Sequence, residues 1–219
     1  MIPHRTRLRT RLMLAFLLTL PTAALAQKAL DFNVDPATTA IHWTLNTNVH
    51  GDIHGSFKLK SGAIHIDPAT GNASGLIVID AASGESGDAS RDSRMNKVVL
   101  DTDKYPTITY RPTHVAGKVD LSAPGPITVD GVMNLHGQDH PMQMSVNLHP
   151  KDTAIASQTH FTIPFVAWGM KDPSFMMFRT GKQVDIDIDA TAVPTAGTTH
   201  ALNSPARAIL RPNEMSIGR

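Results

Sequence analysis

The chain has 219 residues, 41% of them hydrophobic and 18% charged, which indicates one globular domain with a sizeable buried core rather than a disordered chain. Its 20 basic and 19 acidic side chains give a net charge of +1, which argues against the strongly basic face of a nucleic-acid-binding protein. The absence of cysteine excludes disulfides, thiolate catalysis, iron–sulfur clusters, cysteine-ligated zinc and a cysteine-based lipoprotein anchor.

Residues 1–26 have the pattern of a secretory signal peptide. Arginines at positions 5, 7, 9 and 11 precede a short apolar run, 12–20, and Ala24-Leu25-Ala26 predicts cleavage before Gln27. The run is shorter than the roughly 20 residues that span a bilayer. No twin-arginine pair is present, so general secretion to the periplasm is expected. Cleavage removes four arginines and no acid, which leaves 16 basic and 19 acidic side chains and a net charge of −3.

Alternating apolar and polar residues predict several β-strands in the first half of the mature chain. They fall at 41–45, 56–60 and 63–66, whereas 76–79 is apolar on both faces, as in a strand covered on both sides. Residues 90–100 break the pattern because Met95, Val98 and Val99 recur at near-helical spacing. We predict one short helix there, with either Asp88 or Ser90 as its N-cap.

The second half predicts more strands, at 107–110, 128–135, 142–148, 159–163 and 184–190, with a hairpin turn at 136–139. Residues 175–179 are expected to pair with the strand that follows residue 182. Eight or nine strands predict an all-β domain, 27–193, built as a sandwich or a closed barrel. Residues 194–219 read as a loose tail, with one helical turn near 206–210.

The sequence contains none of the common catalytic motifs of hydrolases, metalloproteases, nucleotide-binding or dinucleotide-binding enzymes. Ten histidines remain after cleavage, including the pairs His50/His54 and His136/His140, each four residues apart. That spacing suits a metal site on a helix, but these segments read as loop and hairpin. Surface histidine is the simpler interpretation, and a metal site built from different strands stays open.

Flexible apolar side chains form the second unusual feature. Met133, Met142 and Met144 are expected to face inward from adjacent strands, and residues 165–178 hold a further dense group of Met, Phe and Trp. Such side chains suit a pocket that adapts to a flexible apolar ligand, and they also suit an ordinary barrel core. The group near Phe175 cannot be buried on a single face, because neighbouring strand residues point to opposite sides.

From about residue 30 to residue 193 the chain resembles the YceI-like family of exported, lipocalin-like polyisoprenoid-binding proteins. The resemblance follows an opening Asp35-Pro36 and is carried by five further motifs in order. They are His54-Gly55-Ser56-Phe57 with Ser61-Gly62; Asp80-Ala81-Ala82-Ser83; Arg91-Asp92-Ser93-Arg94-Met95; Lys104-Tyr105-Pro106-Thr107-Ile108-Thr109-Tyr110; and Gly131-Val132-Met133-Asn134-Leu135-His136-Gly137.

The resemblance implies an antiparallel lipocalin-like barrel of about eight strands and one short helix, with an apolar tunnel for an isoprenoid chain. The candidate tunnel residues are Trp43, Phe57, Ile64, Met95, Ile108, Tyr110, Met133, Met144, Phe161, Phe165, Trp168 and Phe175. A lipid head group would need one or two polar partners near the mouth, such as a histidine, Arg91 or Asp92.

The resulting hypothesis is a non-catalytic periplasmic carrier of a polyisoprenoid, or of an isoprenoid quinone, with no other cofactor, no nucleic-acid partner and no membrane span in the mature chain. One alternative is a metal-dependent protein that uses the histidines. Another is an interaction module whose apolar patch near Phe175 docks transiently on the inner membrane or on a protein in it. The sequence leaves the oligomeric state open.

Overall fold

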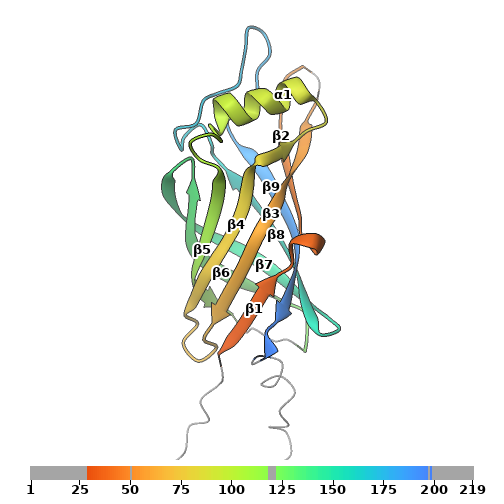
Figure 1. Ribbon diagram of the computed structural model, residues 1–219, viewed down its shortest axis with the longest axis vertical. Coiled ribbons are helices and arrows are strands. Elements are labelled where there is room, and N and C mark those ends of the chain that lie inside the picture. The colour runs from red at the N-terminus through yellow and green to blue at the C-terminus, as the bar shows by residue number, and fades with distance from the viewer. Residues whose placement is uncertain (1–28, 50, 118–121, 197, 199–219) are drawn as a thin grey trace, which may run out of the picture.

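The computed structural model describes residues 29–49, 51–117, 122–196 and 198. The predicted signal peptide and nearly all of the predicted tail lie outside these residues. Within them, nine antiparallel strands form one sheet that closes into a barrel, as expected (Figure 1). The strands are β1 (Leu30–Val34), β2 (Ala40–Leu45), β3 (Ile53–Ile66), β4 (Ala73–Glu85), β5 (Thr107–Ala116), β6 (Gly125–Leu135), β7 (Gln138–Lys151), β8 (Ala154–Ile163) and β9 (Val184–Pro194).

The barrel has eight strand positions because β1 and β2 share one of them. Both strands lie between β3 and β9: β2 pairs with residues 53–57 of β3, and β1 pairs with residues 62–66 farther along the same strand. A 3-10 turn, Pro36–Thr38, joins them, and the Asp35 carboxylate caps it by accepting from the Ala37 amide. Pairing of β3 with β4 then closes the barrel.

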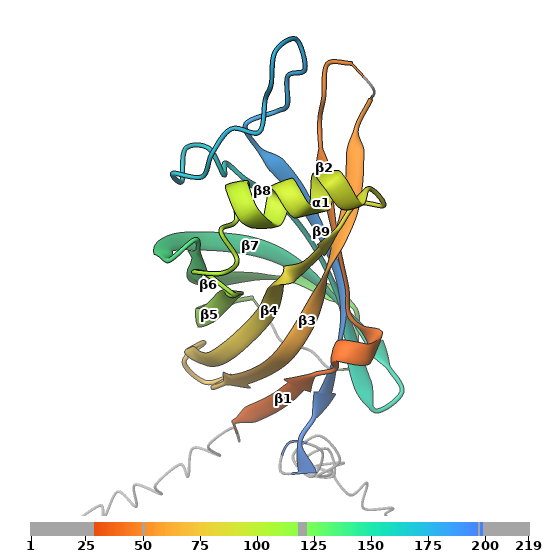
Figure 2. The ribbon, with the colours of Figure 1, turned by 45° about the horizontal axis from the view of Figure 1, so that its top comes forward.

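The two ends of the barrel differ in how they are covered. The lower end, as drawn in Figure 1, is formed by β1 and the last residues of β9, whereas the upper end carries α1 (Ala89–Arg94) and residues 164–183. The Asp88 carboxylate accepts from the Arg91 amide and is the cap of α1. A π-helical turn, Met95–Val99, continues the helix, and Figure 2 shows α1 lying across the upper end.

Three local features differ from the sequence prediction. Residues 76–79 of β4 are not covered on both sides, because Leu76 is 43% exposed. Strand β1 was not predicted, although Leu30, Phe32 and Val34 alternate with polar residues and are buried. Residues 175–179 do not pair with β9: the amide of Phe175 donates to the carbonyl of Phe178, and the reverse bond forms as well, at 3.0 and 2.9 Å. Four consecutive apolar residues therefore form a tight turn instead of a strand.

Candidate ligand-binding cavity

An apolar cavity of about 840 Å³ lies inside the barrel, and all nine strands contribute to its wall. Successive residues of a strand point to opposite faces, so the apolar half of each alternating pattern lines the interior. On β8 and β9 this half includes Ile155, Phe161, Ile186 and Ile188. The volume falls within the range of about 300–1,000 Å³ that is typical of small-molecule pockets.

The cavity is elongated along the barrel. On β3 its wall includes the first residue, Ile53, and the last, Ile66, so it follows this strand from end to end. An eight-stranded barrel is wide enough for packed side chains or for one small ligand. The shape therefore suits a single extended apolar molecule.

Eleven of the twelve candidate residues lie on the cavity wall. They are Trp43, Phe57, Ile64, Met95, Ile108, Tyr110, Met133, Met144, Phe161, Phe165 and Phe175. The structure places Trp168 elsewhere: its ring stacks on the His140 ring at 3.9 Å and 3°, at the side of the turn that follows β8. The role of the eleven side chains as ligand contacts stays a prediction.

Two glycines let aromatic side chains lie flat against the wall. A Cβ at Gly55 would lie 2.3 Å from the Trp43 indole, and a Cβ at Gly131 would lie 2.4 Å from the Tyr110 oxygen. Both glycines belong to motifs noted in the sequence. Burial, with a smaller contribution from Asp130, raises the pKa of Tyr110 to about 12, so its hydroxyl stays neutral.

The cavity opens at the upper end. Its charged wall residues, Asp88, Arg91 and Arg94, all belong to α1 or its cap, and Phe175 and Phe178 line it from residues 164–183, which also lie at the upper end. At the lower end the wall residues are buried: Phe32, Ile66, Val115, Ile127 and Ile155 form an apolar cluster with Leu30. The described residues thus form a tunnel with one mouth.

The two arginines at the mouth differ in their surroundings. Arg91 is held in place, because its Nε donates to the Ser86 hydroxyl at 2.7 Å and its Nη2 to the Ser86 carbonyl at 2.8 Å. Asp92 does not line the cavity, and its carboxylate accepts from the same hydroxyl. The Arg94 side chain has no hydrogen-bond or ion-pair partner in the part of the chain that the structure describes. Of the two arginines, Arg94 therefore has the guanidinium available to a polar ligand group at the mouth.

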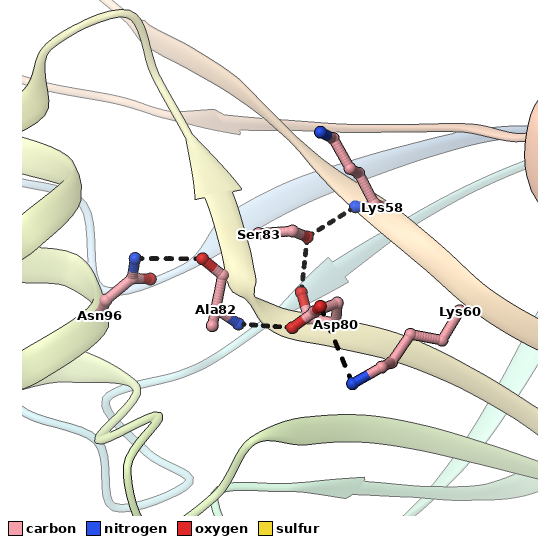
Figure 3. Close-up of polar contacts among 6 residues, drawn as sticks. All are labelled: Lys58, Lys60, Asp80, Ala82, Ser83 and Asn96. Atoms are coloured by element: carbon pink, nitrogen blue, oxygen red, sulfur yellow. Dashed lines mark hydrogen bonds and ion pairs between the residues drawn. The ribbon is translucent and has the colours of Figure 1, made fainter.

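Polar contacts at a bend in β4 hold the turn that follows α1 (Figure 3). The Ser83 hydroxyl donates to the Asp80 carbonyl at 2.6 Å and accepts from the Lys58 amide at 2.8 Å. The Ala82 amide donates to the Asp80 carboxylate at 3.1 Å, and Asn96 Nδ2 donates to the Ala82 carbonyl at 3.4 Å. These contacts tie the π-helical turn to the barrel rim.

The histidines within the described residues do not gather into a metal site, and His50 of the predicted His50/His54 pair lies outside these residues. Among the described residues, no group of three or more His, Asp and Glu side chains is placed to hold a metal ion. Instead, His65 and His160 each pair with one aspartate on the outer surface, at 2.6 and 2.8 Å from Asp31 and Asp187. The same described segments contain no helix long and apolar enough to cross a bilayer.

Comparison with known families decides the classification, because residues 32–192 match the YceI-like domain family. The chain belongs to the YceI-like family. The resemblance inferred from the sequence motifs is therefore confirmed. None of the curated proteins matches the sequence.

Two solved structures share the fold with this chain. One is a polyisoprenoid-binding domain from Saccharophagus degradans implicated in plant cell wall breakdown, with 18% identity, a TM-score of 0.61, and coverage of 75% of this chain and 98% of that one. The other is BcnA of Burkholderia cenocepacia, with 18% identity, a TM-score of 0.59, and coverage of 73% and 99%. At this identity the likeness describes the fold.

Proposed function

We propose that this YceI-like protein is a carrier that binds a polyisoprenoid or a similar long-chain lipid inside its barrel and does not catalyse a reaction on it. The observation that carries the proposal is the elongated apolar cavity with one mouth. The Saccharophagus domain of the same fold is described as polyisoprenoid-binding, which supports an isoprenoid rather than another apolar ligand.

The energetics of this cavity favour a long hydrocarbon chain. Each CH₂ group moved from water into the apolar wall contributes about 0.8 kcal/mol, so affinity grows with chain length without specific polar contacts. Polar side chains inside are few: Tyr110, Ser157 and Thr159 are the ones contributed by β5 and β8. A polar head group is best accommodated at the mouth, beside Ser90 and Arg94.

The carrier is proposed to act in the periplasm. This rests on the signal-peptide pattern of residues 1–26, with cleavage before Gln27. Export would bring the protein to a compartment bounded by membranes, where long-chain isoprenoids and isoprenoid quinones are embedded. A closed apolar tunnel is a suitable environment for such a chain outside a bilayer.

The proposal is tested by purifying the exported chain without detergent, extracting it with organic solvent and analysing the extract by mass spectrometry. The expected result is one class of long-chain isoprenoid in close to equimolar amount. Extracts without lipid, together with failure to take up added polyprenol, would contradict it. Stoichiometric metal by elemental analysis would instead favour the metal hypothesis.

A matched pair of variants tests whether the ligand occupies the tunnel. Ala190 lines the cavity on β9, whereas Ala156 on β8 lies between the inward-facing Ile155 and Ser157 and faces outward. Ala190→Trp should shorten the bound chain or abolish binding, because the new ring fills part of the tunnel. Ala156→Trp should retain the lipid of the unaltered protein, and equal lipid in both variants would place the ligand elsewhere.

A further inference from the structure

The most exposed large apolar side chains of the described residues gather at the upper end of the barrel. Phe175, Met176 and Met177 are 63%, 75% and 86% exposed, and Val49 on the adjoining β2–β3 connection is also exposed. We call residues 175–178 the tip turn. Apolar side chains scattered singly over a surface need no explanation, but three consecutive ones at the end of a projecting segment do.

The tip turn is held in a defined position. Asn48 Nδ2 donates to the Met177 carbonyl at 3.1 Å, and Asn48 Oδ1 accepts from the Arg179 amide at 2.7 Å. The Asn48 amide also donates to the Arg179 carbonyl at 3.1 Å. The side chain of one loop thus fixes the backbone of the other, and the exposed side chains are presented by a braced turn.

Met176 adopts a backbone conformation that is unfavourable for its residue type. Its φ is +49°, in the left-handed region where Gly, Asn and Asp are the usual residues and a long side chain is uncommon. A turn selected for stability alone would have Gly or Asn here. Retaining an exposed Met at such a position points to a use for the side chain itself.

Cationic residues flank the tip turn in the sequence. Lys171, Arg179 and Lys182 are exposed, and Asp172 is the one acid between residues 171 and 182. Hydrogen bonds from Ser174 lower the pKa of Asp172, so it stays ionised, and the segment carries a charge of +2. The expected mature chain carries −3, so this segment is opposite in sign to the protein as a whole.

We propose that the tip turn inserts into the surface of an anionic lipid bilayer. Met176 and Met177 would enter the interface, while Lys171, Arg179 and Lys182 lie at the level of the head groups. Apolar side chains flanked by cations are the combination that binds anionic membrane surfaces.

The position of the tip turn joins this surface to the cavity. Phe175 and Phe178 belong to the turn and also line the mouth, so apolar surface continues from the exposed tip into the tunnel. A docked barrel would therefore place its mouth against the membrane. The functional importance of placing the mouth at the membrane rests on the proposed carrier function. Docking itself requires only the tip turn and the cations that flank it.

Sedimentation with protein-free vesicles tests the docking. The full exported chain should bind vesicles of phosphatidylglycerol and phosphatidylethanolamine more tightly than vesicles of phosphatidylcholine. Met177→Asp should weaken binding about tenfold or more, because it replaces an inserted apolar side chain with a charge. Arg179→Glu and Lys182→Glu should each weaken binding to anionic vesicles about fivefold or more, and less on neutral ones.

Two further variants serve as controls. Leu76→Asp removes an exposed apolar side chain on β4, outside the cavity wall, and should bind vesicles like the unaltered protein. Met176→Gly relieves the unfavourable φ, so it should leave the unfolding temperature unchanged or higher while weakening vesicle binding about fivefold. This separates membrane contact from folding.

The docking proposal is overturned if the unaltered chain ignores anionic vesicles, or if Met177→Asp binds them equally well. Binding to native membranes but not to protein-free vesicles would assign the tip turn to a membrane protein instead. A change from dimer to monomer in Met177→Asp, without vesicle binding, would assign it to a second copy. Uptake of polyprenol delivered in ethanol without vesicles tests the carrier function separately, and Met177→Asp should retain it.

Discussion

The two ends of the barrel are built in opposite ways. At the lower end, apolar side chains from β1, β3, β5, β6 and β8 meet one another and are buried. At the upper end, a six-residue helix and a tight turn cover the opening and leave Phe175, Met176 and Met177 exposed. One sheet thus carries a packed cap at one end and a partly covered mouth at the other.

Backbone contacts reinforce the closure of the lower end. Both backbone groups of Asp31 in β1 form hydrogen bonds with the chain that follows β9. The Asp31 amide donates to the Thr198 hydroxyl at 2.6 Å, and the Asp31 carbonyl accepts from the Thr195 amide at 2.9 Å. Ligand exchange is therefore expected through the upper end.

The largest expected difference in the free energy of unfolding is between two alanine variants, one of a phenylalanine at each end of the barrel. Phe32→Ala should lower the free energy of unfolding by about 3 kcal/mol, because it empties a packed site. Phe175→Ala should change it by no more than about 0.5 kcal/mol, because the side chain is exposed. Urea denaturation measures both, and similar losses in the two variants would contradict the proposed difference between the ends.

The rim of the upper end is expected to be rigid even though the tip is exposed. A Cβ at Gly55 would lie 2.2 Å from the Glu85 carbonyl oxygen and 2.3 Å from the Trp43 indole. Gly55→Ala should therefore cost about 2 kcal/mol of stability and push the indole into the tunnel. Gly125→Ala, where the added methyl meets nothing within 4 Å, is the matched control and should be neutral. Equal unfolding midpoints for the two variants would show that the upper end rearranges to accommodate the added methyl group and is not rigid.

Sequence periodicity predicted the wall of the tunnel better than its mouth. Inward-facing residues such as Met133, Met144 and Phe161 follow from strand alternation, which fixes the face of each side chain once a strand is recognised. Strand β1 carries the same signal over five residues, and it could have been found from the alternation of Leu30, Phe32 and Val34.

The mouth could not be predicted in this way, because irregular segments have no period. Trp168 lies in a turn, where the local backbone decides that its ring stacks on His140 rather than facing the tunnel. Arg94 lies on the cavity wall because α1 crosses the upper end, and the turn that follows α1 is bonded to β4 through Asn96 and Ala82. Both depend on contacts between residues far apart in sequence, which one sequence does not reveal.

A smaller effect is expected from the contact that braces the tip turn. Asn48→Ala removes two hydrogen bonds, to the Met177 carbonyl and from the Arg179 amide, and leaves the barrel wall intact. Because these groups are exposed to water, the loss should be about 1 kcal/mol of global stability or less. Amide hydrogen exchange should become faster at Phe178 and Arg179. Asn147→Ala, on the outer face of β7, is the control. If exchange at Phe178 and Arg179 were also faster in this variant, the effect would reflect a general loss of stability and not the loss of the Asn48 hydrogen bonds.

The smallest effect concerns the tunnel wall between the two ends. Burial raises the pKa of Tyr110 to about 12, against about 10 in an unfolded chain. The folded state therefore holds this proton more tightly than the unfolded state, and the associated stability is present below pH 10 and is lost as the pH rises towards 12. Thermal unfolding between pH 9 and 12 should show a steeper decline for the unaltered protein than for Tyr110→Phe, which has no hydroxyl to ionise. If the unfolding temperatures of the two proteins declined in parallel, water would reach the Tyr110 hydroxyl. The wall at this depth would then be less closed than the lower end.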